Sequence, residues 1–600
     1  MIQYQYIKDQ STLECLINRL LQVQTWGLDL ETTGLDPHVD KILLCQIGRP
    51  GENYVIDMRY CNLAVLRDPF FENPLICKIA HQGKFEYKFL RSIGARMERV
   101  RCTFLAEKVI NAGRKEYLES SKLDEVALRR IGASLPFDKK TMQLSFVGHV
   151  GDFTEQQLMY AAWDSDVLLP TLQNQIAEMA NLGLISTYQI ECDALPAFAD
   201  MEYDGIDFNK EVWASNISRN KARLDDLGRE LDSIHDNDMF GGSVTNYASP
   251  AETLKILRKM GLKAPYYDQE KRVEVMKLVT STGKDTLAHL SKYPFVDKLL
   301  KWRSLHTQIS NFGEGYLKHV HPITGRIHPE TFQIGAATGR ISNATGAPNF
   351  LNIPREGGYR DCILAPDGYI MENDDYVTGE PKIVASLSGC KKMIDILNRG
   401  EDIYMGAATA MYGRPCDKSE RPLYKKLLLA IHYMEGVNAF YQDLRLSGVQ
   451  VTREGAMNAY YSYKNNFKEV IDFLDSNGNQ ACSQLFLANG NGRRRYWSNP
   501  LTDGARAQIK REGGNFAIQS VNADFIKVAL ARIRNYIKTN NIRSRLVNSV
   551  YDDILTCTHE GDTDSFHLAK QRIMEESAQQ FVPNVRMTVS GKTSKFWVKD

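Results

Sequence analysis

The sequence predicts a protein of the mixed α/β class that is divided into several domains. Alternating or apolar runs of strand-forming residues occur at residues 26–31, 370–371 and 546–556. Stretches with the apolar spacing of helices occur at residues 156–171 and 421–434. Because 600 residues are too many for a single hydrophobic core, the length suggests about four domains.

The composition is that of a globular protein, with 43% hydrophobic and 24% charged residues, which excludes disordered and collagen-like classes. The net charge of +1 gives no evidence for a nucleic-acid partner, so that argument depends on local clusters. The eleven cysteines lack the spacing of a zinc site, and the sequence has no signal peptide or membrane-spanning run. These features predict a soluble, cytoplasmic protein.

The first 185 residues contain three acidic elements in order. Asp29 and Glu31 alternate in the strand pattern WGLDLE, so both point to one face just before a turn. Glu86 lies in the amphipathic segment HQGKFEYKFL, and Tyr160 and Asp164 are four residues apart on one helical face. Carboxylates at a strand end suit a hard cation, although a D-x-E pattern alone is more often a solvated strand end.

Residues 368–389 are expected to form a strand, a tight turn and a helix. Asp374 and Asp375 follow the apolar run, and Pro381 fits the first turn of a helix, where its missing amide has no partner. Asp375 is therefore expected at a strand end, facing a helix start. An isolated Asp-Asp pair is most often a solvated turn, so other parts of the chain must favour a site.

A second acidic pair and a row of cations lie further along the chain. In LVNSVYDDILT, Asp552 and Asp553 lie among strand formers, where a buried carboxylate is costly unless it binds a metal or pairs. The predicted helix at residues 421–434 carries Arg421 and Lys425 on one face. Such a row is usually a solvated stripe, but it also matches an extended polyanion such as a triphosphate.

The middle of the chain is expected to be a helical scaffold or clamp. Ser249 caps a predicted helix, and residues 271–305 are expected to be mostly amphipathic helix with breaks near Gly283 and Pro294. The following loop around Arg340 is rich in Gly, Thr, Ser and Asn, which suits contacts to phosphate, sugar and base edges. An ordinary polar loop is the alternative.

Six motifs together resemble the bacterial DNA polymerase I family (family A). They are TGRIS at 338–342, PNFLNIP at 348–354, DYVTGEPK at 375–382, RPLYK at 421–425, NFAIQSVNADFIK at 515–527 and VYDDI at 550–554. The three acidic elements of the N-terminal part resemble the 3′–5′ exonuclease domain of the DEDD class. The order and spacing of these motifs make chance an implausible explanation.

The resemblance implies an RNase H-like α/β exonuclease domain followed by a right-hand polymerase of palm, fingers and thumb. The expected segments are the exonuclease domain (1–185), the thumb and connecting palm segments (186–345), the palm (346–390), the fingers (391–535) and the palm again (536–600). No 5′-nuclease domain is expected to precede Asp29, which suggests a bacteriophage or a similar compact replicon as the source.

The resemblance also implies a metal site in the exonuclease domain. Two divalent cations would be held by four carboxylates: Asp29, Glu31, Glu86 and Asp164. Tyr160 would orient the attacking water. Glu86 and Gln82 stand where the family usually has Asp and Asn, so both side chains are one methylene longer.

In the polymerase half, the resemblance places two Mg²⁺ ions, with Mn²⁺ as the alternative, roughly 4 Å apart between Asp375 and Asp552. Tyr376 is a further expected ligand, and Asp553 is a further expected catalytic residue. The nucleotide would be bound by Arg421, Lys425, Leu429, Tyr433, Glu380 and Tyr404. Glu380, with Tyr433 as its partner, would crowd a ribose 2′-hydroxyl and so select deoxynucleotides.

Two further sets of residues are expected to contact primer–template DNA. The first set is Arg340, Arg511, Asn515 and Gln519, of which the last three are spaced by four residues and could share a helical stripe. The second set, Arg493 and Arg494, follows a Gly-rich turn and would bind backbone phosphates in a salt-dependent way.

The fingers helix departs most from the family pattern, because Leu429 replaces Phe or Tyr and Ala430 replaces Gly. Tyr404 stands in place of a phosphate-binding His, and Tyr551 and Asp553 stand in place of His and Glu. None of these changes removes a required metal ligand. They bear on nucleotide affinity and sugar discrimination.

The expected function is template-directed DNA synthesis from dNTPs with 3′–5′ proofreading, by a monomer for which no accessory protein is indicated. Three alternatives stay open: an exonuclease whose polymerase half has become a DNA-binding clamp, a binding module without chemistry, and RNA-templated synthesis, because Tyr-Asp-Asp also resembles reverse transcriptases. Retention of Asp375 and Asp552 argues against the clamp. SGKTS at 590–594 is not a phosphate-binding loop, because Arg586 stands where its first Gly would be.

Overall fold

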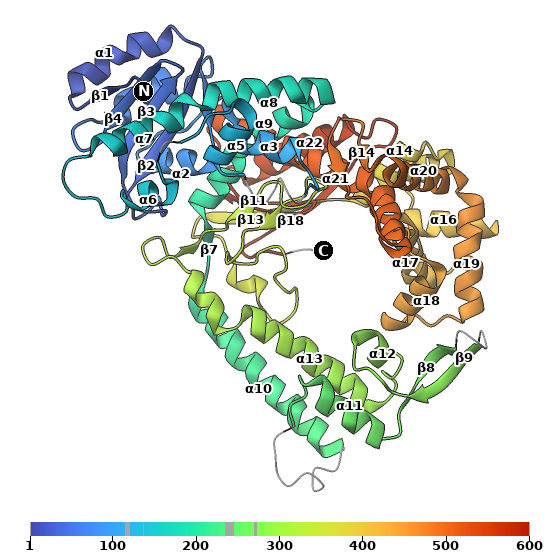
Figure 1. Ribbon diagram of the computed structural model, residues 1–600. Coiled ribbons are helices and arrows are strands. Elements are labelled where there is room, and N and C mark those ends of the chain that lie inside the picture. The colour runs from blue at the N-terminus through green and yellow to red at the C-terminus, as the bar shows by residue number, and fades with distance from the viewer. Residues whose placement is uncertain (1, 115–120, 136, 235–244, 269–272, 599–600) are drawn as a thin grey trace.

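The computed structural model describes residues 2–114, 121–135, 137–234, 245–268 and 273–598. An N-terminal α/β domain lies against a four-stranded sheet, the palm (Figure 1). From the palm, the thumb helices extend on one side and the fingers helices on the other. Among the described residues, no helix combines the length and the apolar character needed to cross a membrane.

The N-terminal domain is built on a six-stranded mixed sheet with the strand order β1-β4-β3-β2-β5-β6. Its strands are β1 (Gln5–Ile7), β2 (Thr25–Thr32), β3 (Ile42–Arg49), β4 (Glu52–Asp57), β5 (Cys77–Ala80) and β6 (Val100–Cys102). Its helices are α1 (Gln10–Leu21), α2 (Lys84–Ser92), α3 (Thr103–Ile110), α5 (Leu123–Ile131), α6 (Lys139–Leu144), α7 (Glu155–Asp166) and α8 (Leu168–Leu182). The strand predicted at residues 26–31 is confirmed as β2, and the helix predicted at residues 156–171 is divided into α7 and α8 at Val167.

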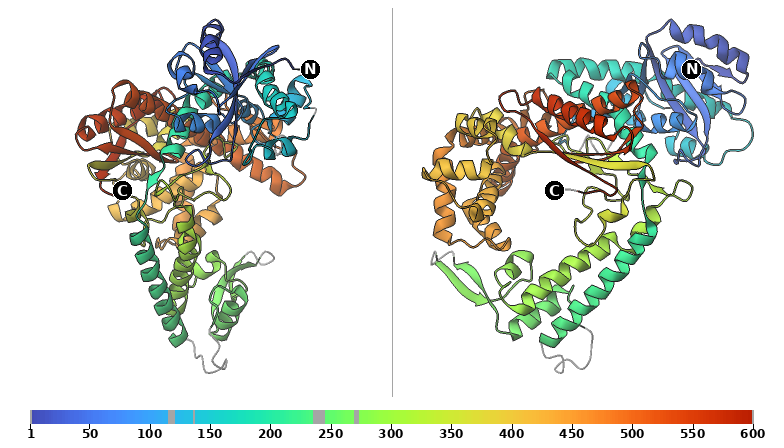
Figure 2. Two further views of the ribbon diagram at one scale, coloured as in Figure 1. Left: turned by 90° about the vertical axis from the view of Figure 1, so that its left-hand side faces the viewer. Right: turned by 180° about the vertical axis from the view of Figure 1, so that it is seen from behind.

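Residues 186–345, the expected thumb and connecting palm segments, begin with α9 (Ile185–Asp204) and the short strand β7 (Ile206–Asp207), which pairs with β10 (Arg326–Ile327). Two long helices, α10 (Lys210–Ile234) and α13 (Pro294–Phe312), run side by side (Figure 2). The tip consists of α11 (Pro250–Lys259), α12 (Lys284–Ala288) and the hairpin of β8 (Lys263–Asp268) and β9 (Val273–Leu278). Ser249 caps α11 as predicted, because its hydroxyl accepts a hydrogen bond from Glu252 N.

The thumb also contains an error of the sequence prediction. Residues 271–305 were expected to be mostly helical, but β9 is a strand, while α12 and α13 begin after Gly283 and at Pro294 as expected. Residues 269–272 lie outside the described residues. A short run such as VEVMKL does not distinguish helix from strand by its apolar spacing, and antiparallel pairing with β8 decides the outcome.

The palm is a four-stranded antiparallel sheet with the order β16-β17-β13-β18. Its strands are β13 (Tyr369–Tyr376), β16 (Ser544–Val550), β17 (Asp553–His559) and β18 (Val589–Ser594). It packs against α14 (Gly379–Ser388), α21 (Asp503–Thr539) and α22 (Thr563–Gln579). Residues 368–389 thus form the predicted strand, turn and helix, and SGKTS lies in β18 rather than in a phosphate-binding loop.

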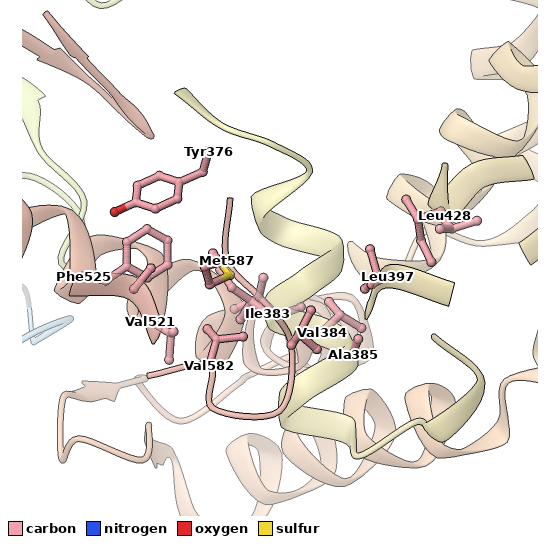
Figure 3. Close-up of a cluster of buried hydrophobic side chains, with 14 of the residues drawn as sticks. Tyr376, Ile383, Val384, Ala385, Leu397, Leu428, Val521, Phe525, Val582 and Met587 are labelled. Carbon is pink, nitrogen blue, oxygen red and sulfur yellow. The ribbon is translucent and has the colours of Figure 1, made fainter. Parts of the chain in front are cut away.

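The fingers pack on the palm through a shared hydrophobic core. Their elements are α15 (Lys391–Asn398), α16 (Ile403–Tyr412), α17 (Arg421–His432), α18 (Val437–Leu446), α19 (Arg453–Asn466), α20 (Lys468–Gln484), β14 (Phe486–Ala488) and β15 (Arg494–Tyr496). Figure 3 shows Ile383 and Val384 of α14 in one cluster with Val521 and Phe525 of α21 and with Val582 and Met587. Leu428 of α17 belongs to the same core, so α17 is held in a fixed relation to the palm.

Candidate active sites

The exonuclease carboxylates predicted from the sequence lie together in the N-terminal domain. Oxygen atoms of Asp29, Glu31 and Asp164 lie within 4.8 Å of one another. Glu86, in the first turn of α2, lines the same cavity, as does Tyr160 of α7. Strand β2 and two helices that are distant in the sequence therefore bring together all five predicted residues.

Local backbone features position these side chains. Thr154 caps α7 by accepting a hydrogen bond from Gln157 N, which fixes the start of the helix that carries Tyr160 and Asp164. Gln82, just before α2, has a φ of +64°, in the left-handed region. Asn adopts that region more readily than Gln, which gives a physical reason for the Asn that the family usually has there.

The carboxylates repel one another in a buried site. Burial raises the pKa of Glu86 to about 8 and that of Asp164 to about 6. Burial, followed by the charges of Asp164, Glu31 and Glu86, raises the pKa of Asp29 well above its usual range. Glu86 Oε2 and Asp164 Oδ1 are buried and accept no hydrogen bond from the described residues. An all-oxygen donor set with excess negative charge fits a hard divalent cation such as Mg²⁺.

Sequence reasoning missed two charged residues at this site. Lys139 lines the cavity, and its ammonium donates a hydrogen bond to Asp124 Oδ1 at 2.7 Å. Lys139 lies in the polar segment FDKK, which has no pattern that distinguishes it from a solvated helix start. Only the packing of α5 and α6 brings its charge to the carboxylates.

The palm carboxylates lie on neighbouring strands. Asp375 of β13 is the register partner of Asp553 of β17, and Asp552 lies in the two-residue connection between β16 and β17. The other connecting residue, Tyr551, has a φ of +58°, so this hairpin holds a bulky residue in the left-handed region. The three aspartates therefore lie at one end of the palm sheet, as the sequence predicted for Asp375.

Two neighbours of Asp375 have structural roles. The Tyr376 hydroxyl donates to Met574 O at 2.7 Å, and its ring is buried against Phe525, so its side chain is not a metal ligand. If Tyr376 is a metal ligand, as predicted, only its main-chain carbonyl remains as a donor. Asp374 binds Lys570 on the opposite face, and although burial alone would raise the pKa of Asp374, that ammonium holds it at about 2.

The predicted nucleotide-binding residues form two groups. Tyr433 donates to Glu380 Oε1 at 3.0 Å, as the sequence predicted, and the Arg340 guanidinium also binds Glu380 Oε1 at 2.8 Å, which was not predicted. In the second group, the guanidinium carbon of Arg421 lies 5.0 Å from the ring centre of Tyr404.

The outward face of α17 completes this arrangement. Arg421 and Lys425 are exposed, and Leu429 is half-buried one turn further along. Arg421 Nε donates to Asp402 Oδ2 at 2.6 Å. The predicted row therefore lies on one helical face, and its first cation already has a carboxylate partner.

Two of the predicted DNA contacts are corrected by burial. Arg493 is only 3% exposed, and its guanidinium binds Glu191 of α9 and Asp524 of α21 at 2.6 and 2.7 Å. Asn515 is also buried, and its amide donates to His432 O. Neither side chain is available to DNA in this structure, because the neighbouring elements cover it.

The remaining predicted DNA contacts stay accessible. Arg511 is exposed and Gln519 is half-buried on α21, while Arg494 is half-buried with its guanidinium 5.0 Å from the ring centre of Phe486.

This pair of carboxylate sites is the arrangement of a nucleotidyl-transfer protein joined to an exonuclease domain. Residues 218–599 match the family model of DNA polymerase family A, and residues 4–181 match that of a 3′–5′ exonuclease. The chain belongs to DNA polymerase family A and carries an N-terminal exonuclease domain.

Curated relatives agree with this assignment. A DNA polymerase I of Chloroflexus aurantiacus is 26% identical over 588 residues, which cover 93% of this chain and 60% of the relative. A DNA polymerase I of Pseudomonas aeruginosa is 23% identical over 629 residues, which cover 97% of this chain and 65% of the relative. The chain thus spans less than two thirds of the length of these relatives.

A solved structure confirms the fold. The POL domain of Pol1 from M. smegmatis, in complex with DNA primer-template and dNTP, matches with a TM-score of 0.80 and 22% identity over 99% of each chain. The predicted order, an exonuclease domain followed by a polymerase domain in a mixed α/β chain, is therefore confirmed.

Proposed function

We propose that the chain adds deoxynucleotides to a primer 3′ end on a DNA template and removes nucleotides from a 3′ end at a separate site. The observation that carries this proposal is the presence of two independent carboxylate sites, one on β2, α2 and α7 and the other on β13 and the β16–β17 hairpin. The bound primer-template and dNTP of the M. smegmatis structure support the same partners here.

At the palm, Asp375 and Asp552 would hold two Mg²⁺ ions, which lower the pKa of the primer 3′-hydroxyl and brace the leaving pyrophosphate when they are bound. The main-chain carbonyl of Tyr376 would be a further donor, and Asp553 would support the site from the adjoining strand. Arg421 and Lys425 would neutralise the triphosphate, which requires Arg421 to exchange its Asp402 partner for a phosphate.

At the exonuclease site, the four carboxylates would hold the cations, and Tyr160 would orient the attacking water. Burial and the nearby carboxylates raise the pKa of Tyr160 far above its usual range, so its hydroxyl keeps its proton. A neutral, buried hydroxyl can donate to Asp164 or to a water without releasing charge into the site.

Glu380 would select deoxynucleotides at the polymerase site. Its carboxylate is held by Arg340 and Tyr433 from two other segments, so it has little freedom to move away from a ribose 2′-hydroxyl. Arg340, Arg511, Gln519 and Arg494 remain the proposed DNA contacts. The proposed palm, fingers and thumb boundaries are those predicted from the sequence, with core residues shared between palm and fingers.

The test is a labelled primer–template incubated with Mg²⁺, with and without dNTPs, on DNA and RNA templates. Extension with dNTPs and shortening without them are expected on DNA. Shortening alone would favour an exonuclease with a DNA-binding clamp, for which Leu429, Ala430 and Tyr551 are the motivating departures. Equal extension on RNA would favour the RNA-templated alternative, and neither extension nor shortening would overturn the proposal.

A further inference from the structure

The wall of the exonuclease cavity contains a cation to which the family motifs give no role. The cavity has a volume of about 530 Å³, and Lys139 lines it together with the carboxylates. Lys139 is the first residue of α6, which is capped by Asp138 through a hydrogen bond from Thr141 N. The cap fixes the point at which the Lys139 side chain leaves the backbone.

The Lys139 ammonium is held in place rather than free to swing into solvent. It donates to Asp124 Oδ1 at 2.7 Å, and Asp124 belongs to the first turn of α5. The two side chains are only 16% and 26% exposed. An ion pair that is largely sheltered from water keeps a defined geometry better than a surface pair does.

The charge of Lys139 reaches the carboxylates. Lys139 lines the same cavity as Asp29, Glu31 and Asp164, so a phosphate bound at these carboxylates would also lie beside its ammonium. Because Asp124 already pairs with Lys139, this ammonium has two further N–H groups for another acceptor.

Hydrolysis of a phosphodiester at this site would be favoured by an additional positive charge near the phosphate. Four carboxylates and two divalent cations are together neutral, whereas the scissile phosphodiester brings one negative charge. In hydrolysis, the water oxygen bonds to phosphorus, the bond from phosphorus to O3′ breaks, one water proton ends on O3′, and the other stays with the released 5′-monophosphate. Negative charge therefore grows on the phosphoryl oxygens and O3′ in the transition state.

We propose that Lys139 is a catalytic residue of the exonuclease site, whose ammonium binds a non-bridging oxygen of the scissile phosphate and stabilises the charge that develops there. This inference rests on the proposed exonuclease function. Asp124 is the corresponding positioning residue. The adjacent Lys140 is exposed and provides a matched control.

The test compares Lys139→Met, Lys139→Arg, Asp124→Asn and Lys140→Met by their kcat and KM on a labelled single-stranded oligonucleotide. Lys139→Met should lower kcat by about 100-fold, as loss of a transition-state donor does, with KM changed by less than about threefold. Lys139→Arg should retain more activity, and Asp124→Asn should lose about tenfold, less than Lys139→Met, because the ammonium remains. Lys140→Met should match the wild type, and polymerase activity should be unchanged in all variants.

Binding of the oligonucleotide in EDTA and the thermal unfolding midpoint provide readouts without catalysis. Both should be nearly unchanged in Lys139→Met if Lys139 acts on the transition state. Equal kcat losses in Lys139→Met and Asp124→Asn, with a lowered midpoint and no recovery in Lys139→Arg, would overturn the inference in favour of a structural ion pair. A fully active Lys139→Met beside an active wild type would overturn the inference alone, whereas an inactive wild type would overturn the proposed function with it.

Discussion

The two carboxylate sites differ in how their charges are compensated. In the exonuclease site, burial and mutual repulsion raise the pKa values of the carboxylates, and Lys139 gives only partial compensation. In the palm, the buried Asp374 is paired with Lys570 and its pKa is lowered to about 2, while Asp375 lies at the sheet end opposite Asp553. The carboxylates of the N-terminal domain thus share an excess of negative charge, whereas a buried lysine balances Asp374 in the palm.

A second contrast lies in the junction between the halves. Glu191 of α9 is fully buried and binds both Arg493 and Lys527, and Lys527 also donates to Gly339 O next to Arg340. Buried ion pairs of this kind fix geometry, because removing one partner leaves an uncompensated charge. The junction is therefore rigid, whereas the two carboxylate sites must accept ligands.

The largest expected effect separates the two sites. Asp375→Ala and Asp552→Ala should each lower primer extension by roughly 1,000-fold or more while leaving exonuclease activity intact, because each removes a proposed metal ligand. Asp29→Ala and Asp164→Ala should do the reverse. Rates on a labelled primer–template, with and without dNTPs, measure both activities.

The matched control is Asp367→Ala, whose carboxylate is fully exposed and should be dispensable. Extension at the wild-type rate by Asp375→Ala would remove the assignment of the palm metal site.

The next largest effect is expected on the stability of the protein, when the buried ion pairs at the junction are broken. Arg493→Met should destabilise the protein by about 3 kcal/mol, because it leaves Asp524 and Glu191 with unbalanced buried charge. The exposed control Arg506→Met should change stability by less than about 0.5 kcal/mol. Urea unfolding measures both.

One outcome would contradict the structural role of Arg493. If Arg493→Met kept wild-type stability but lowered the salt dependence of DNA binding, Arg493 would be a phosphate contact as the sequence first suggested, and the buried network would be wrong.

A smaller effect is expected at Glu380, the residue proposed to select the sugar. Glu380→Ala should raise ribonucleotide incorporation relative to deoxynucleotide by about 100-fold, because it removes the group proposed to crowd the 2′-hydroxyl. Tyr433→Phe removes only one hydrogen bond to Glu380 and should give about tenfold. Single-nucleotide kcat/KM ratios measure this selectivity.

Glu401→Ala, an exposed carboxylate near the fingers, is the control for the sugar test. Unchanged selectivity in Glu380→Ala would assign the discrimination to another group.

The smallest effect tests the electrostatic repulsion among the buried carboxylates of the exonuclease site. The folded-state pKa of Glu86 is about 8, above its ordinary value of 4.5, so this carboxyl group lowers stability progressively as pH rises from the ordinary value to the folded one. Glu86→Gln should therefore raise the unfolding midpoint in EDTA by a few degrees more at about pH 8.5 than at about pH 5.5.

Mg²⁺ should reduce this gain, because a bound cation compensates the same charge. The exposed Glu14→Gln serves as the control, and a gain that is independent of pH would mean that Glu86 is not part of a crowded carboxylate set.

Much of the molecule could be predicted from local patterns. Alternation predicted β2 with Asp29 and Glu31 on one face, and helical spacing placed Tyr160 and Asp164 together. These predictions succeed because strand and helix periods determine which neighbours share a face. The pairing of Glu380 with Tyr433 was predicted from the family motifs and is also present.

Other features of the structure depend on contacts between distant segments and could not be predicted from local patterns. The sequence cluster of Arg493 and Arg494 looks like a phosphate-binding patch, but α9 and α21 cover Arg493 and supply its carboxylate partners from distant segments. Strand β9 forms because residues 263–268 are beside it to accept its backbone hydrogen bonds, which its own six residues cannot reveal.

Local patterns and motifs predicted the strands and helices that carry the acidic residues, the two acidic sets and the family. Long-range packing sets which charges face a site and which are buried in ion pairs. It buried Arg493 against Glu191 and Asp524 and brought Lys139 to the exonuclease carboxylates. The physical reason is that the cost of a charge depends on its burial and its partners, and both are set by segments that are far away in the chain.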